Sequence, residues 1–274
     1  MKTSAKIIFT ILWICLIFTY PVLGQVSPKG LEAILIVGHQ EDGTKSAIED
    51  MDKIADVFIE NGVIVHKFYD DKANWNEIVE TAKKCSFLVY SGHGTDLGEG
   101  GNVGGICINS RVSSAELMAK LKLKDNALVI FKSVCYGAGT SADDDDDIGV
   151  AEAKKRVTYY AYPFFETGAS AYYANNFWYG VYDFLKDFLS GTTLKQAYLN
   201  STKTWTTVEF EEPFSKDPAK YISIASTPEG GTATRTTYTN GIKKVEQIKS
   251  PKGYKIAYVG NPEFSIRNMT VQKK

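Results

Sequence analysis

The segment FLVYSGHG (residues 87–94) joins a short apolar run to a histidine that lies between two glycines. Phe87–Tyr90 shows no alternation of apolar and polar residues, which is typical of a strand covered on both faces of a parallel sheet. The run then breaks into Ser-Gly-His-Gly. The segment therefore predicts a buried strand that carries His93, one of only three histidines in the chain, to the end of a sheet.

The same alternation of apolar runs and helical periodicity extends on both sides of this segment. Further strands are predicted at 33–37, 63–69, 127–131, 169–174 and 254–259. Helices are predicted over 46–61, 74–84 and 177–189, and the capping-box pattern at Ser113–Glu116 begins another that ends near Lys122. Repeated β–α alternation favours an α/β fold, a three-layer sandwich with a mainly parallel central sheet and helices on both faces. The Thr-, Ser- and Gly-rich stretch 200–250 predicts loops and an antiparallel hairpin.

The first 24 residues have the pattern of a cleaved secretory signal peptide. Two lysines in MKTSAK precede the apolar stretch IIFTILWICLIF, which is too short for a comfortable membrane span, and small residues precede a cleavage point before Gln25. We therefore expect a secreted or periplasmic protein with a single domain over 25–274 and no membrane contact after cleavage. A net charge of −1 gives no reason to expect nucleic acid as a partner.

Three cysteines remain after the predicted cleavage, at positions 85, 107 and 135. An odd number in an oxidising compartment leaves at least one free thiol or an intermolecular bond. One hypothesis pairs Cys85 with Cys107 and leaves Cys135 free, and the alternative is three buried thiols.

His93 and Cys135 each follow a predicted strand, and each lies in a glycine-containing turn. Ligands of open α/β sheets bind beyond the carboxyl ends of the strands, so both side chains are expected in one crevice if the strands are neighbours. A thiol beside an imidazole, with backbone N–H groups to hold an oxyanion, is the minimal machinery for nucleophilic acyl transfer. All three histidines precede Cys135, an order that excludes α/β-hydrolase and papain-like enzymes.

The segments YSGHGTD (90–96) and SVCYGAG (133–139) resemble the histidine and cysteine segments of metacaspases, and more widely of the caspase, clostripain and gingipain group of cysteine peptidases. A weaker likeness covers roughly residues 30–265. The resemblance implies a caspase-like fold and a cysteine endopeptidase that acts on peptides or proteins without a required cofactor. It also implies that Cys135 is the nucleophile, that His93 is the general acid/base, and that the N–H groups of Gly94 and Cys135 form the oxyanion hole.

One position departs from the pattern of that group. Metacaspases and several relatives have an aspartate two residues before the cysteine, where it helps to bind a basic P1 residue, whereas this chain has Ser133, preceded by Lys132. The resemblance thus supports the reaction but not a basic P1 preference. Lys132 is expected either to favour an acidic P1 residue or to point into solvent. His39 follows the first strand at the same edge and is a further candidate for the substrate pocket, whereas His66 is expected to be structural.

Five consecutive aspartates, Asp143–Asp147, follow the cysteine segment. Asp143, Asp144 and Asp145 are candidate calcium ligands, because some metacaspases bind calcium, although such a run is more often a solvated loop. The basic triplet Lys154–Arg156 is either a self-processing site or an ordinary surface feature. Two other functions remain open: a caspase-like module that binds a partner without cleaving it, and an amidase or acyltransferase that uses the same Cys-His pair.

Overall fold

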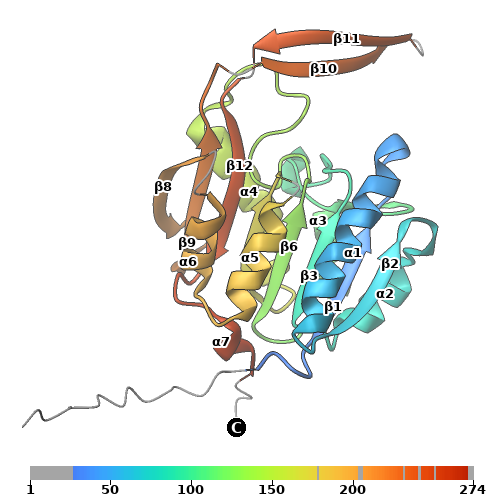
Figure 1. The fold of residues 1–274 in the computed structure, drawn as a ribbon, viewed down its shortest axis with the longest axis vertical. Coiled ribbons are helices and arrows are strands. Elements are labelled where there is room, and N and C mark those ends of the chain that lie inside the picture. The colour runs from blue at the N-terminus through green and yellow to red at the C-terminus, as the bar shows by residue number, and fades with distance from the viewer. Residues whose placement is uncertain are drawn as a thin grey trace, which may run out of the picture.

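The computed structural model describes residues 27–177, 179–202, 206–230, 232–239, 242–249 and 251–270, and the predicted signal peptide lies outside these ranges. An eight-stranded sheet with the order β2-β1-β3-β6-β7-β12-β9-β8 forms its centre (Figure 1). Its strands are β1 (Glu32–Val37), β2 (Ile64–Tyr69), β3 (Phe87–Ser91), β6 (Ala127–Lys132), β7 (Ala169–Asn175), β8 (Thr207–Phe214), β9 (Asp217–Thr227) and β12 (Gly253–Gly260). The pairs from β2 to β7 are parallel and those from β7 to β8 are antiparallel, which confirms the α/β class and the mainly parallel sheet.

Apolar residues on both faces of β1, β3 and β6 explain why these strands lie in the middle of the sheet. In β1, Ile34 and Ile36 pack into the core on one face, whereas Ala33, Leu35 and Val37 pack into the core on the other. Because successive side chains of a strand point to opposite faces, a run without polar residues requires cover on both sides.

Helices supply that cover on each face of the sheet. One face carries α1 (Thr44–Glu60), α5 (Gly180–Leu189), α6 (Leu194–Thr202) and α7 (Ile266–Thr270), with α1, α5 and α6 in front of the sheet in Figure 1. The other face carries α2 (Trp75–Ala82), α3 (Ser114–Lys120) and α4 (Gly149–Phe165). No helix in the described part of the chain is both long and apolar enough to cross a membrane.

The expectation of loops over much of 200–250 is wrong for β8 and β9, which extend the main sheet. The serines that suggested a loop are satisfied within the sheet, because Ser223 Oγ donates to the Phe210 carbonyl oxygen at 2.8 Å and Ser226 Oγ donates to Glu209. The predicted hairpin is confirmed and lies farther along, as β10 (Thr232–Thr239) and β11 (Ile242–Lys249).

Three helices, α4, α6 and the short α7, were not predicted. The charged start of α4 follows the aspartate run directly, and its apolar face is formed by residues that are spread over the whole helix, Ala153, Val157, Tyr160, Ala161 and Phe164. The remaining short elements are the 3-10 turns η1 (Glu41–Gly43), η2 (Asp70–Lys72) and η3 (Glu99–Gly101), and the strand pair β4 (Ile106–Cys107) and β5 (Arg111–Val112).

Candidate functional site

Two neighbouring parallel strands bring His93 and Cys135 to the same edge of the sheet. β3 pairs with β6 in a register that places Tyr90 opposite Phe131, and the two site residues follow shortly after the ends of these strands. The turns behind them are in direct contact, because a Cβ added at Gly94 would lie 2.0 Å from the carbonyl oxygen of Cys135. Glycine at position 94 is therefore what allows the histidine turn to approach the cysteine turn so closely.

Two buried tyrosines fix the histidine turn from below. The Tyr90 hydroxyl lies 2.8 Å from the carbonyl oxygens of His93 and Cys107, and the Tyr160 hydroxyl accepts the N–H of Thr95 at 2.7 Å. Burial raises the pKa of the Tyr90 phenol well above its ordinary value, so the hydroxyl keeps its proton. Neutral phenols inside the core thus hold the backbone of this turn in place.

The imidazole of His93 has a carboxylate partner that sequence reasoning missed. Its Nε2 lies 3.0 Å from an Oε2 of Glu41, a residue in the η1 turn after β1. Glu41 has a φ of 43°, in the left-handed region, and its side chain is 72 % exposed. With Nε2 engaged by the carboxylate, Nδ1 is the ring nitrogen left for proton transfer. The position of Glu41 in the sequence could have indicated this contact, because Glu41 follows β1, whose carboxyl end lies at the same edge as that of β3.

The backbone around Cys135 has an uncommon conformation. Ser133 and Tyr136 have φ values of 55° and 67°, and residues other than glycine adopt such values at a cost of about 1–3 kcal/mol each. Cys135 is half-buried and its thiol is free. Strain concentrated on both sides of a residue is typical of a functional turn.

The predicted oxyanion donors are available for a ligand. Within the described residues, the backbone N–H groups of Gly94 and Cys135 donate no hydrogen bond, and no hydrogen bond joins the Cys135 thiol to the His93 ring. The two side chains therefore share an edge without a hydrogen bond between them, and the backbone N–H groups of Gly94 and Cys135 beside them have no acceptor. Catalytic contacts often close only when substrate is bound.

A cavity of about 440 Å³ opens on the histidine side of this edge. His93, Glu41 and Tyr136 contribute side chains to its wall, together with Arg111. A space of this size lies in the range of small-molecule and side-chain pockets.

Lys132 neither points into solvent nor faces the substrate side of the edge, the two positions expected from the sequence. It is only 4 % exposed, and its Nζ forms an ion pair with Asp50 of α1 at 2.9 Å. Strand alternation explains this, because Phe131 faces the α4 side and the next residue therefore faces α1. The expectation that Lys132 points into solvent is wrong, and its charge is neutralised by Asp50 rather than offered to an acidic P1 residue. Ser133, in contrast, is exposed at the edge.

His39 lies at the predicted edge but belongs to a separate ion pair. Its Nδ1 is 2.9 Å from Asp70 of η2, and this carboxylate raises the pKa of the imidazole. The residue lines a second cavity of about 520 Å³ with Glu41, which also lines the His93 cavity. The structure thus places His39 beside the candidate site and not within the cavity of His93. His66 pairs with Glu32 of the neighbouring strand at 2.7 Å, in agreement with a structural role.

The aspartate run is partly folded into the protein. Asp144 accepts two hydrogen bonds from Arg156 of α4, at 3.0 and 2.8 Å, so the expectation of a solvated loop is wrong for this residue. Asp143, Asp144 and Asp145 are the candidate calcium ligands, and the carboxylate of Asp144 is already bound by Arg156. No group of three or more metal-ligating side chains occurs in the part of the chain that the structure describes. The basic triplet Lys154–Arg156 lies within α4, whereas proteolysis requires an extended chain.

The hypothesis of a Cys85–Cys107 disulfide is wrong, because all three described cysteines are free. Cys85 is buried, and its Sγ donates to the Thr81 carbonyl oxygen at 3.3 Å. Burial raises the pKa of this thiol to about 12, so Cys85 is not a competing nucleophile.

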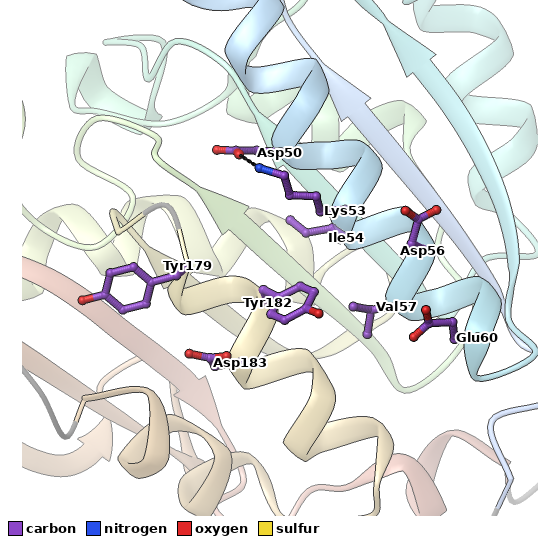
Figure 2. A pocket seen from close by; sticks show the side chains of 9 residues that line it. All are labelled: Asp50, Lys53, Ile54, Asp56, Val57, Glu60, Tyr179, Tyr182 and Asp183. Carbon is purple, nitrogen blue, oxygen red and sulfur yellow. Dashed lines mark hydrogen bonds and ion pairs between the residues drawn. The ribbon is translucent and has the colours of Figure 1, made fainter.

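A further cavity, of about 470 Å³, lies between α1 and the start of α5 (Figure 2). Figure 2 shows the carboxylates of Asp56, Glu60 and Asp183 around it, with the Asp50–Lys53 ion pair at one end. Asp50, which lines this cavity, also forms the ion pair with Lys132 at the end of β6. The cavity therefore lies on the α1 side of the sheet, next to the strand that precedes Cys135.

No protein-family model matches this chain, and a search of curated proteins found no match.

Proposed function

We propose that this protein is a secreted, caspase-like cysteine endopeptidase that cleaves peptide bonds through Cys135 and His93. One observation carries the proposal: the paired strands β3 and β6 bring the two residues to one edge, with the N–H groups of Gly94 and Cys135 unpaired beside them. The resemblance of residues 90–96 and 133–139 to metacaspase segments supports the same reading.

The reaction follows from these positions. The Cys135 thiolate attacks the carbonyl carbon of the scissile bond, and the N–H groups of Gly94 and Cys135 hold the resulting oxyanion. His93 protonates the leaving amine, which breaks the C–N bond and leaves a thioacyl-enzyme. A water molecule, deprotonated by His93, then attacks the thioester, and release of the acid regenerates the thiolate. No cofactor takes part in these steps.

The test is a peptide-library digestion that compares the wild type with Cys135→Ala, with and without calcium. We expect cleavage by the wild type alone, independent of calcium, and selective labelling of Cys135 by iodoacetamide. Cys107→Ala is the matched control, since Cys107 is the other half-buried free thiol, and it should cleave as the wild type does. Unchanged cleavage by Cys135→Ala contradicts the assignment. An unreactive Cys135 without any cleavage favours the binding module, and turnover of amides but not peptides favours the amidase.

Glu41 is expected to contribute only modestly, because its ion pair with His93 is exposed to water. Exposed pairs contribute about 0.2–1 kcal/mol, so Glu41→Gln should lower kcat/KM by no more than about fivefold. The measurement is kcat/KM at low and high NaCl, where salt should reduce the difference between the two proteins. Glu49→Gln, in the helix α1 that follows η1, is the control. A loss above a hundredfold would show that Glu41 acts in the chemistry itself.

A further inference from the structure

Lys255 is a charged residue whose backbone lies beside the cysteine segment 133–139. It lies near the start of β12, whose first residues are at the carboxyl edge because β12 runs antiparallel to β7. The ladder between β12 and β9 pairs Tyr254 with Ser226 and Ile256 with Ala225, so Lys255 is the extra residue of a β-bulge. Bulges are frequent beside active sites, where they redirect a side chain.

Three backbone contacts join this bulge to the cysteine segment. Asn176 N–H donates to the Lys255 carbonyl oxygen at 2.9 Å, and Ser133 N–H donates to the carbonyl oxygen of the adjoining Asn175 at 3.0 Å. On the other side, Thr140 N–H donates to the Tyr254 carbonyl oxygen at 3.2 Å. Lys255 is thus tied to the chain both before and after Cys135.

Lys255 is half-buried, and its ammonium lacks an anion. In the described ranges it forms no ion pair, unlike Lys132. Burial lowers the pKa of the ammonium, whereas the nearby groups Cys135 and Asp144 favour its charged form. Asp144 is already held by Arg156. A partly desolvated cation without a counter-ion gains most from a ligand that brings one.

Two further features lie beside the β-bulge at Lys255. A Cβ at Gly253 would lie 2.6 Å from Cε of Lys255, so the glycine leaves room for the lysine stem. The side-chain oxygen of Asn176 is buried and has no hydrogen-bond partner among the described residues. The bulge is therefore shaped around the lysine and has an unpaired hydrogen-bond acceptor beside it.

We propose that Lys255 binds the side-chain carboxylate of an acidic residue at P1, the residue whose carbonyl Cys135 attacks. The inference rests on the proposed peptidase function and gives that site its substrate class. The P1 side chain leaves the carbon next to the reacting carbonyl, so a charged group anchored beside Cys135 is placed to meet it. Ser133 adds no acidic side chain that would repel a carboxylate there.

The experiment uses fluorogenic tetrapeptides with mixed P2–P4 positions and Asp, Glu, Asn, Gln or Arg at P1. For the wild type we expect kcat/KM at least tenfold higher with Asp or Glu than with Asn or Gln. Lys255→Met should reduce this ratio to within about threefold of one and leave the Asn and Gln substrates nearly unchanged. Lys255→Glu should favour Arg over Asp. Lys252→Met is the control, because Lys252 lies in the same segment but is paired with Glu209 at 2.8 Å.

A second measurement keeps this inference separate from catalysis. In the Cys135→Ala background, fluorescence anisotropy should show peptides ending in a P1 Asp amide binding at least tenfold more tightly than their Asn counterparts, and Lys255→Met should remove the difference. The inference is overturned if the wild type prefers basic or apolar P1 residues, if Lys255→Met lowers all substrates equally, or if only a free terminal carboxylate is recognised. Carboxylate-dependent binding without turnover would support Lys255 while contradicting the peptidase.

Discussion

His93→Ala is expected to lower kcat/KM for peptide hydrolysis by about 10²–10⁴, the usual contribution of a general acid/base. The substitution removes the imidazole that protonates the leaving amine, although the oxyanion donors and the thiol stay in place. Because His93 is half exposed and lines a cavity of about 440 Å³, free imidazole should enter the variant and restore part of the rate. The measurement is kcat/KM as a function of imidazole concentration.

His39→Ala is the matched control for this experiment. It removes an imidazole from the same edge, but one that pairs with Asp70 and lies outside the His93 cavity. Its kcat/KM should stay within about threefold of the wild type, since an exposed ion pair contributes little. Equal losses in the two variants would show that His93 has no special role.

Asp50→Ala is expected to lower the free energy of unfolding by about 3–5 kcal/mol. The substitution leaves the ammonium of Lys132, only 4 % exposed, without its counter-ion inside the sheet face. The double variant Asp50→Ala, Lys132→Met should recover most of this loss, because it removes the stranded charge. Urea denaturation followed by circular dichroism measures each free energy.

Asp52→Ala on the same helix is the control, because its ion pair with Lys67 is exposed and its loss should cost less than about 1 kcal/mol.

The ion pair between Asp50 and Lys132 also predicts that the free energy of unfolding depends on pH. Burial opposes ionisation of Asp50, but Lys132 and Lys53 outweigh it and the pKa of the carboxyl is lowered below 3.8. Its stabilisation is therefore present above the ordinary pKa and is lost as pH falls through the lowered one. A double variant no more stable than Asp50→Ala would contradict this account.

The sequence predicts the parallel half of the sheet well, because apolar runs such as Phe87–Tyr90 have no other way to be covered. The sequence does not predict β8 and β9, because their serines suggest a loop. In the structure these hydroxyls form hydrogen bonds with the neighbouring strand, as Ser223 does with the Phe210 carbonyl oxygen. The sequence does not predict helix α4, because its charged first turns directly follow the aspartate run and resemble a continued polar loop.

The same division holds for the candidate site. Cys135, His93 and Gly94 were predicted because each lies in or beside a glycine turn just after a strand. Glu41 and Lys255 were missed because their positions depend on a 3-10 turn and a β-bulge, neither of which has a reliable sequence pattern. Lys132 was misplaced since its environment depends on Asp50 from a distant helix.

The β10–β11 hairpin leaves and rejoins the sheet at one point, because Thr227 at the end of β9 pairs with Gly253 at the start of β12. Figure 1 shows it standing beyond the end of the sheet. In topological terms it is an insertion between two residues that are already neighbours. Its length and sequence are therefore free to vary between related chains without shifting the register of β9 and β12, and natural selection can change the hairpin and the sheet independently.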